Sequence, residues 1–421
     1  MKSIMKKVIL IAIIFTGFSF YAQNRDLDNF RQPDKRGIND FEAPKDSVST
    51  FENVKVRLGG ASTLQYQSLS HENDANNLPE LGSNFNLATA NLDLDVALAE
   101  GVRMHLRTYL SSQHHTEAYV KGGYIQIDNL NFISEGFLSD FMKHARIKIG
   151  HMENNYGDAH YRRTDNAMAL YNPFVGNYLM DSFTTEVGAE LYYFHNSWFG
   201  MLGFTNGKLN QNVTDKDQTS PSFLVKVGYD NQFDEDFRFR LTGSLFHSAH
   251  NNARGIYMYS GDRAGSRYYS VMTNVDGNGD TFRGGRINPN LKNEMTAIMI
   301  NPFIKAGGLE FFGIFESSTG KTKSETDRRN WTQISGELIY RLGEKENVYI
   351  GARINSVKGA FAANQEDVTV NRRQIGAGWF MTKNILMKAE YVNQKYKDYP
   401  VGDVHEGGKF NGLVLEAAIS F

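Results

Sequence analysis

The sequence predicts an all-β chain, a transmembrane antiparallel β-barrel of 16 strands. Three observations lead to this prediction. From Val54 onward, apolar and polar residues alternate in runs of about ten, the pattern of strands with one face in lipid and the other in a water-filled lumen. The number of runs is even, as a closed barrel with both termini on one side requires. No stretch after residue 22 stays apolar for the roughly 18 residues that a membrane helix needs.

The composition excludes several other classes of protein. The 421 residues include no cysteine, 39 glycines, 21 tyrosines and 29 phenylalanines, and the formal net charge is -2. Without cysteine, a disulfide scaffold, a thiolate metal site and a lipid anchor on an N-terminal cysteine are excluded. The net charge offers no basic surface for nucleic acid. The many aromatic residues suit a barrel, whose two membrane interfaces carry girdles of Tyr and Trp.

Residues 1–22 predict a secretory signal peptide. Lys2, Lys6 and Lys7 form a positive segment, a short apolar segment follows from Val8 to Phe15, and Ala22 is the expected cleavage site. Together with a barrel, export indicates the outer membrane of a Gram-negative type of cell. Residues 23–52 are polar and without periodicity, so we expect a mobile periplasmic leader there; a plug entering the barrel is the less favoured alternative, because so polar a stretch has little surface with which to pack. The barrel itself is assigned to 53–421.

The predicted strands are taken in order from the alternating runs. They lie near 54–67, 85–98, 102–112, 117–128, 145–150, 186–196, 198–206, 222–230, 237–247, 294–305, 308–318, 331–342, 346–357, 372–382, 385–396 and 410–421. Short connections such as 99–101, 196–197 and 383–384 alternate with long polar ones such as 151–185 and 248–293. Short periplasmic turns and long outer loops produce this asymmetry. The long connection 129–144 breaks the rule, and FLSDFMKHA within it predicts a brief helix.

The stretch from Ile147 to Gly207 carries a resemblance to a known family. It contains a strand, a glycine, a long polar loop, the segment EVGAELYYF, a tight turn and a strand that ends Thr205-Asn206-Gly207. This order resembles the phosphate- and pyrophosphate-selective porin superfamily. The resemblance implies a sixteen-stranded barrel, a homotrimer, and a loop after the fifth strand that folds into the pore. The independent strand count places 151–185 after the fifth strand. The C-terminal Phe421 is similarly what outer-membrane barrels present to the barrel-assembly machinery.

Alternation predicts which charged residues face the lumen. The main basic candidates are Lys55, Arg57, Arg103, Arg107, Arg146, Lys148, Arg238 and Arg240. Acidic residues are predicted throughout the same lumen, so tight phosphate selectivity is not expected, and a mild basic excess predicts a weak preference for anions.

In the loop 151–185, the candidates for the pore constriction are Arg162, Arg163, His160, Glu153 and Asp158. Guanidinium groups match the geometry of phosphate and carboxylate, so Arg162 and Arg163 are candidates for contacting an anionic solute. The alternative is that both residues pin the folded loop to carboxylates of the wall. The sequence favours this structural role, because loop charges are often paired internally.

Two other groups of residues were weighed. Asp276, Asn278 and Asp280 resemble the opening of a calcium loop, but Thr281 replaces the expected glycine and no glutamate follows at the last position, so a turn is favoured over a metal site. His247 and Ser248 are neighbours on one strand and point to opposite faces, which argues against a hydrolase embedded in the barrel.

The sequence therefore predicts an outer-membrane porin for passive diffusion of small hydrophilic solutes, with no enzymatic activity and no cofactor. Its expected partners are outer-membrane lipid and lipopolysaccharide, small hydrophilic or anionic solutes, and no nucleic acid. The alternative reading is a non-conducting structural or secretion-associated barrel, closed by the leader or by the loop 248–293.

Overall fold

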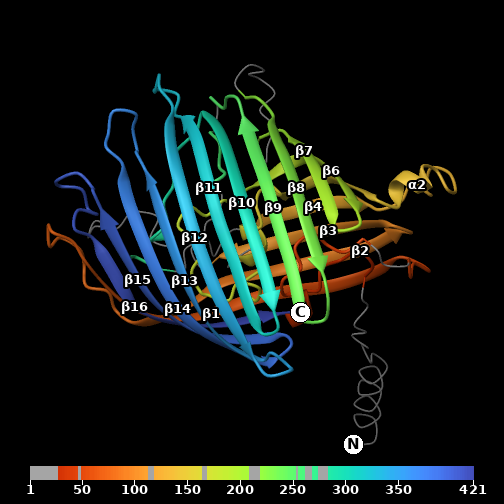
Figure 1. Ribbon diagram of the computed structural model, residues 1–421, viewed down its shortest axis with the longest axis horizontal. Helices are drawn as coiled ribbons and strands as arrows, with labels where there is room; N and C mark the ends of the chain where they lie inside the picture. The colour runs from red at the N-terminus through yellow and green to blue at the C-terminus, as the bar shows by residue number, and fades with distance from the viewer. Residues whose placement is uncertain are drawn as a thin grey trace, which may run out of the picture.

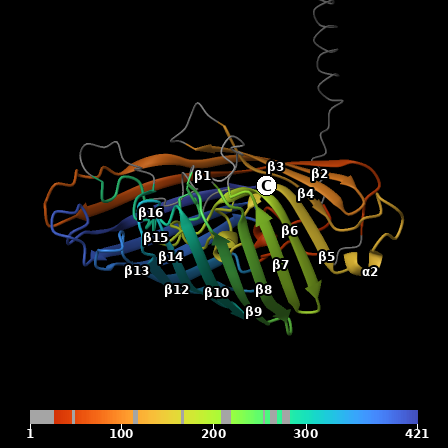
Figure 2. The ribbon, with the colours of Figure 1, turned by 90° about the horizontal axis from the view of Figure 1, so that it is seen from above.

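The computed structural model describes residues 27–45, 49–111, 118–163, 168–207, 219–252, 255–260, 268–273 and 283–421. Sixteen antiparallel strands close into one barrel, in which each strand pairs with its neighbours in the sequence and β1 pairs with β16 (Figures 1 and 2). The predicted fold class is confirmed, and all sixteen predicted strands are present. The strands are β1 (Lys55–Glu72), β2 (Asn84–Ala99), β3 (Val102–Ser111), β4 (Tyr119–Ile127), β5 (Ala145–Glu153), β6 (Thr185–His195), β7 (Trp198–Thr205), β8 (Ser222–Gln232), β9 (Phe237–Ser248), β10 (Glu294–Ala306), β11 (Leu309–Lys321), β12 (Arg329–Leu342), β13 (Val348–Gly359), β14 (Val368–Thr382), β15 (Ile385–Lys397) and β16 (Lys409–Ser420).

Closure is made by a continuous ladder between the first and last strands. The register runs from Ala61 opposite Ser420 to Glu72 opposite Lys409. Beyond the ladder, Gly60 and Phe421 exchange two backbone hydrogen bonds of 3.0 Å. Closure satisfies the backbone groups that an open sheet edge would leave unpaired in lipid.

One rim of the barrel consists mainly of tight turns. Asn196, in the connection between β6 and β7, and Gly307, in that between β10 and β11, adopt positive φ values of 52° and 55°. Such left-handed residues let antiparallel strands reverse within two positions. The exception on this rim is the connection between β4 and β5, which holds the helix α2 (Ser139–Met142), as the sequence predicted. The long connections lie at the opposite rim.

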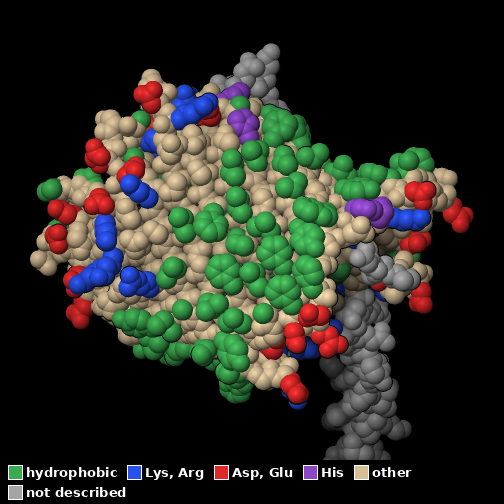
Figure 3. Space-filling view, in the orientation of Figure 1, with side chains coloured by type: hydrophobic (Ala, Val, Ile, Leu, Met, Phe, Trp, Pro, Cys, Tyr) green, Lys and Arg blue, Asp and Glu red, His purple; other side chains and the backbone are tan. Residues whose placement is uncertain are grey.

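The outer surface of the barrel is apolar over its middle. Figure 3 shows apolar side chains gathered in a broad band over the strands that face the viewer. Strands whose outward residues are apolar, in alternation with inward-facing residues, are typical of a barrel that stands in lipid. The exposed side chains include Leu58, Leu92, Leu202, Phe204, Ile298, Ile300, Phe315, Ile334, Leu338, Ile350, Ile354 and Ile375.

Among the residues that the structure describes, no helix is long and apolar enough to cross a bilayer. The described residues also include two 3-10 turns, η1 (Lys35–Gly37) and η2 (Ala159–Arg162), and both belong to segments that enter the lumen.

Candidate solute pathway

Three segments enter the barrel and fill much of its lumen. They are residues 27–45 (hereafter the strap), the described parts of the loop after β5 (154–163 and 168–184), and the described parts of the loop after β9 (within 251–293). Figure 2 shows chain without strand structure inside the ring of strands. The apolar side chains of the two loops, among them Val175, Leu179 and Ile256, are buried against the inner wall.

The inner wall that receives the loops is itself apolar. On β10, the inward positions include Met295, Ala297, Met299 and Phe303, all at most 1% exposed. The expectation that inward positions are polar throughout is therefore wrong for this part of the barrel. The physical reason is that the wall here packs against folded chain and forms a hydrophobic core, instead of lining a water-filled channel.

The strap lies across the rim that carries the short turns. At its start, the Phe30 ring lies under the guanidinium groups of Arg57 and Arg103, at 4.0 and 5.0 Å from its centroid. At its middle, the Lys35 amide donates to the Lys383 carbonyl at 2.8 Å, in the turn between β14 and β15. Near its end, Arg146 donates to the Ala43 carbonyl at 2.6 Å and to the neighbouring Pro44 carbonyl at 2.7 Å. The strap thus touches both sides of the barrel.

This position differs from the mobile leader that the sequence favoured for 23–52. The difference is explained by the apolar and charged residues of the segment itself. Phe41 is 2% exposed and packs edge-on against Phe303 of β10 at 5.5 Å, and Asn39 donates to Glu310 of β11 at 2.7 Å. The average composition of the segment is polar, so it did not predict that Asn39 and Phe41 would have partners on the barrel wall.

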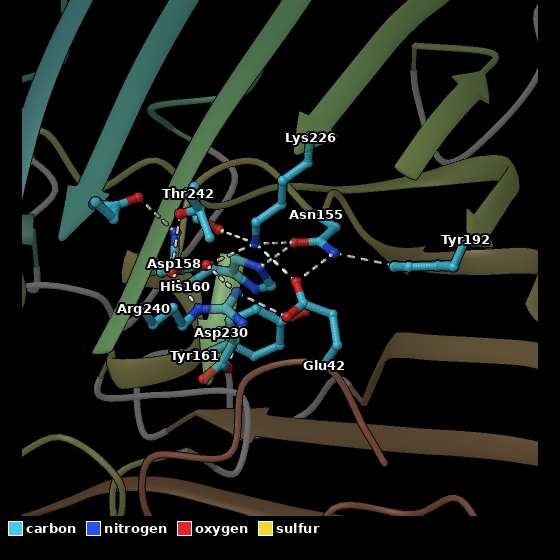
Figure 4. Close-up of polar contacts among 12 residues, drawn as sticks. Glu42, Asn155, Asp158, His160, Tyr161, Tyr192, Lys226, Asp230, Arg240 and Thr242 are labelled. Carbon is cyan, nitrogen blue, oxygen red and sulfur yellow. Dashed lines mark hydrogen bonds and ion pairs between the residues drawn. The ribbon is translucent and has the colours of Figure 1, made fainter. Parts of the chain in front are cut away.

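Four buried charges connect the strap, the loop after β5 and the wall (Figure 4). Glu42 of the strap contacts Lys226 Nζ at 3.0 Å and Arg240 Nη2 at 2.7 Å. Asp158 of the loop contacts the same two cations, at 2.7 Å from Lys226 Nζ and 2.8 Å from Arg240 Nε. All four side chains are at most 6% exposed, so little water screens these pairs.

The charges of this cluster hold both carboxylates in the ionised form. Burial alone would raise the pKa of Glu42, but the neighbouring charges of Arg240 and Lys226 lower that pKa to about 2. The same two cations lower the pKa of Asp158 against the opposing effect of burial. The strap and the loop are therefore fastened to β8 and β9 by charge at neutral pH.

Arg162 and Arg163 are buried and paired with carboxylates. Arg162 donates to Glu337 of β12 at 3.0 and 2.6 Å, and Arg163 donates to Asp181 of its own loop at 3.0 and 2.5 Å. Both side chains are 1% exposed. This geometry matches the alternative in which the two arginines pin the folded loop, to the wall in one case and to itself in the other.

A cavity of about 150 Å³ remains beside the wall of β1–β5. Seven basic residues and three acidic ones line it. The basic residues are Arg31, Arg57, Arg103, Arg107, Lys121, Arg146 and Lys148, and the acidic ones are Glu42, Asp93 and Glu153. The lining of this cavity therefore carries an excess of four cations over carboxylates.

Several cations of this wall are paired with acids on neighbouring strands. Arg107 binds Asp93 through two bonds of 2.7 Å, and Arg57 binds Asp95. Arg103 differs from them. Its Nη2 donates to Gln126 at 2.8 Å, but its Nε and Nη1 have no partner among the described residues, although the side chain is only 7% exposed. Two buried donors of Arg103 thus lack an acceptor among the described residues, which is costly.

The predicted lumen residues fall into three groups. Arg57, Arg103, Arg107, Arg146 and Lys148 line the cavity, as do the loop residues Glu153 and His160. Arg238 and Arg240 bind carboxylates elsewhere: Arg238 binds Asp230 at 2.7 Å and Arg240 binds Asp158 at 2.8 Å. Lys55 lies near the rim and donates to the Thr50 carbonyl at 2.9 Å. Asp276, Asn278 and Asp280 lie outside the described residues.

His160 lies at the edge of the cavity. Its Nδ1 lies 3.3 Å from Glu153 and its Nε2 lies 3.1 Å from Asn155. Burial lowers the pKa of His160, although Glu153 acts in the opposite direction. Within the described residues, no group of three His, Asp or Glu side chains could hold a metal ion.

Two cavity residues were missed by the sequence analysis. Lys121 lies next to a register shift between β3 and β4, where strict alternation misassigns faces. Arg31 belongs to the strap. The sequence feature that could have indicated a packed strap is the presence of Phe30 and Phe41 within an otherwise polar segment.

Comparison with solved structures supports the architecture. The chain is similar to an anion-selective porin from Comamonas acidovorans, with 11% identity and a TM-score of 0.57, covering 88% of this chain and 100% of that one. It is also similar to the outer membrane channel DcaP of Acinetobacter baumannii, with 11% identity and a TM-score of 0.54, covering 89% of this chain and 99% of that one. A third similar structure is OprB of Pseudomonas putida, with 10% identity and a TM-score of 0.52, covering 88% of this chain and 94% of that one. No family model and no curated protein matches the sequence. The chain therefore has the fold of bacterial outer-membrane porins, while the phosphate-selective superfamily stays a prediction.

Proposed function

We propose that the chain is an outer-membrane channel that lets small hydrophilic solutes pass along the wall of β1–β5, with a preference for anions. The observation that carries this proposal is the charge of the cavity there, with seven basic residues against three acidic ones. A pore discriminates by its width and by the charges at its narrowest part. A cationic lining with low-dielectric surroundings raises the local concentration of anions.

Arg103 is the residue that we expect to contact the solute. Its side chain lines the cavity, and its Nε and Nη1 have no acceptor among the described residues. Guanidinium groups are suited to carboxylate and phosphate. The neighbouring cations Arg57 and Arg107 are neutralised by Asp95 and Asp93, so they shape the site more than they charge it. This partial neutralisation supports a weak preference for anions and argues against tight phosphate selectivity.

The width of the route limits the solutes. A space of about 150 Å³ holds on the order of five to ten water molecules. The strap and the loop after β5 form the side of this space that faces the lumen, so their position sets the width. Ions and small metabolites are the solutes that fit such a space.

Planar-bilayer recordings test the proposal. In a salt gradient, we expect the reversal potential of the full-length protein to have the sign of an anion-preferring pore. Arg103→Glu should move it toward cation preference without unfolding the barrel. Arg328→Gln is the matched control, because Arg328 lies in an outer loop with its side chain 62% exposed. A cation-preferring wild-type pore, or an Arg103→Glu variant with an unchanged reversal potential, would contradict the assignment.

A second candidate function, a non-conducting structural barrel, is favoured by the strap and by the packed core of the β10 side. The two candidates differ in the recordings. If neither the wild-type protein nor a variant with a released strap conducts, the barrel is structural. The location in a Gram-negative outer membrane and the homotrimer belong to the porin proposal, with support from the predicted signal peptide and the porin fold.

A further inference from the structure

The outer face of β13–β16 changes from apolar to polar toward the long loops, at one level on β14, β15 and β16 and one row later on β13. Across these four strands, Ala352, Ile375, Tyr391 and Leu413 lie in one row, because each is opposite the next in the ladder. The next outward row toward the long loops contains Ile354, Arg373, Asn393 and Asn411. Above an apolar band that faces lipid, such a change marks the level of the lipid headgroups.

Three exposed cations stand at or just above this level. Arg373 lies on β14, and Lys395 and Lys397 lie on the neighbouring β15. Asn393 is opposite Arg373, so Lys395 is the diagonal neighbour of Arg373, at a Cβ distance of roughly 7–8 Å. In Figure 3, basic side chains gather at the left, beside the apolar band and over the upper parts of these strands.

These three cations have no acidic partner among the described residues. Two other basic residues at the margin of the same face do have one: Lys358 lies 3.5 Å from Asp367, and Lys409 lies 2.6 Å from Glu72. None of the outward residues of β13–β16, all of which the structure describes, is acidic. In a chain with a net charge of -2, three adjacent uncompensated cations at the edge of an apolar band call for an anion outside the chain.

The same place is hollowed. A groove of about 490 Å³ runs over the outer wall, with Ile334 and Ile354 on its apolar side and Arg373, Lys395 and Lys397 on its cationic side. Its polar side also carries Asn371 and Asn393, whose amides are hydrogen-bond donors. A groove that is apolar at one end and carries cations and amides at the other fits a molecule with an apolar part and an anionic part.

We propose that this groove binds a phosphate-bearing lipid of the leaflet on the long-loop side. The phosphate lies between Arg373 and the two lysines, and an acyl chain lies along Ile334, Ile354 and their apolar neighbours below. A free phosphate ion would use the cations but leave the apolar part unoccupied. A protein partner would have to reach a surface that lies at the headgroup level. This site rests on the barrel standing in a membrane, but it does not depend on conduction.

The neighbouring face of β10–β12 shows why the site is local. At the corresponding rim, Glu294 of β10 lies within 3.9 Å of Lys321 and also binds Arg328. The cations there are already neutralised by a carboxylate of the chain. The face of β13–β16 lacks such a carboxylate, and an external phosphate group can take its place.

Lipid retention measured by native mass spectrometry tests the proposal on the full-length protein in detergent. Diphosphoryl lipid A is the phosphate-bearing probe, diacylglycerol is the probe with acyl chains alone, and inorganic phosphate is added as a competitor. We expect the protein to retain lipid A, to lose diacylglycerol, and to keep lipid A in millimolar phosphate. Equal retention of diacylglycerol, or complete displacement of lipid A by inorganic phosphate, would overturn the lipid assignment; both arms need only the wild-type protein.

The triple variant R373Q/K395Q/K397Q locates the site. Each basic residue near an anionic surface contributes about a factor of five, so lipid A should bind about 100-fold more weakly. The matched control K321Q/R328Q removes two basic residues at the same rim that Glu294 already neutralises, and it should retain lipid A as the wild type does. Retention by the triple variant equal to that of the control would refute the site. If the triple variant fails to fold, the single variant R373Q replaces it, with a smaller expected loss of lipid A binding. Bilayer conductance of the same samples tests the channel function separately.

Discussion

The strap offers the sharpest quantitative prediction, because one carboxylate, that of Glu42, makes its ion pairs with β8 and β9. Glu42→Gln removes the negative charge that Arg240 and Lys226 share, and keeps the size and the hydrogen-bonding ability of the side chain. The strap should then open far more often, while the barrel, whose ladders do not involve Glu42, stays closed.

The magnitude follows from the burial of the pair. Removing one partner of a buried ion pair costs about 3–5 kcal/mol. Here Asp158 still neutralises both cations, and glutamine can accept a hydrogen bond, so the loss should be nearer to about 2–3 kcal/mol. Since 1.4 kcal/mol is a factor of ten, the open population of the strap should rise about 30- to 150-fold.

Hydrogen–deuterium exchange of the strap amides measures this population directly. The Gly37, Ile38 and Asp40 amides donate to carbonyls within the strap, at 2.9, 3.2 and 3.3 Å, and should exchange faster by that factor. Glu52→Gln is the control, because Glu52 is an exposed glutamate just beyond the strap. A change below about three-fold in Glu42→Gln would mean that the ion pairs contribute less than about 0.7 kcal/mol, and the charge-based account of the strap would fail.

Three further predictions follow from the same structure. The carboxyl pKa of Glu42 is lowered from 4.5 to about 2. The ionised carboxylate therefore stabilises the docked strap fully above pH 4.5, and this stabilisation is lost as the pH falls through 2. The difference in amide exchange of the strap between wild type and Glu42→Gln should shrink across that pH range. Glu337→Gln leaves the buried guanidinium groups of Arg162 and Arg353 without their carboxylate. It should destabilise the protein by about 3–5 kcal/mol in denaturant unfolding, whereas an unchanged midpoint would show that other groups neutralise them. Mass spectrometry of the exported protein should find Gln23 at the mature N-terminus, and a mass that includes residues 1–22 would contradict the predicted cleavage.

The strands were predictable because alternation is a local and repeated signal. Arg57, Arg103 and Arg107 were placed on the inner wall from their spacing alone, and all three line the cavity. A one-residue error in register would turn a whole strand inside out, so an apolar outer face fixes the inward set strongly. The prediction failed where this regularity ends, as at Lys121 beside the register shift of β3 and β4.

The contents of the lumen were less predictable, because alternation tells which face a side chain is on and not what lies opposite to it. The sequence favoured a loop-pinning role for Arg162 but could not name its partner, and only the fold brings Glu337 of β12 within 2.6 Å of it. The segment from Asn172 to Met180, NPFVGNYLM, did contain a signal that was not used. Its apolar residues are unusual for a solvated loop, and Phe174, Val175, Tyr178, Leu179 and Met180 are all at most 2% exposed.

The composition of the inner wall itself explains why the open space lies where it does. An apolar loop gains free energy by covering apolar wall, such as Met299 and Phe303 of β10. The wall of β1–β5 offers such a loop less apolar surface, and its Arg103 already has two buried donors without acceptors among the described residues. Each such buried donor costs about 1–3 kcal/mol. The apolar parts of the loops therefore pack on the side where burial is favourable, and the remaining cavity lies beside the cations of β1–β5. The basic character of the proposed solute route follows from this division of the inner wall.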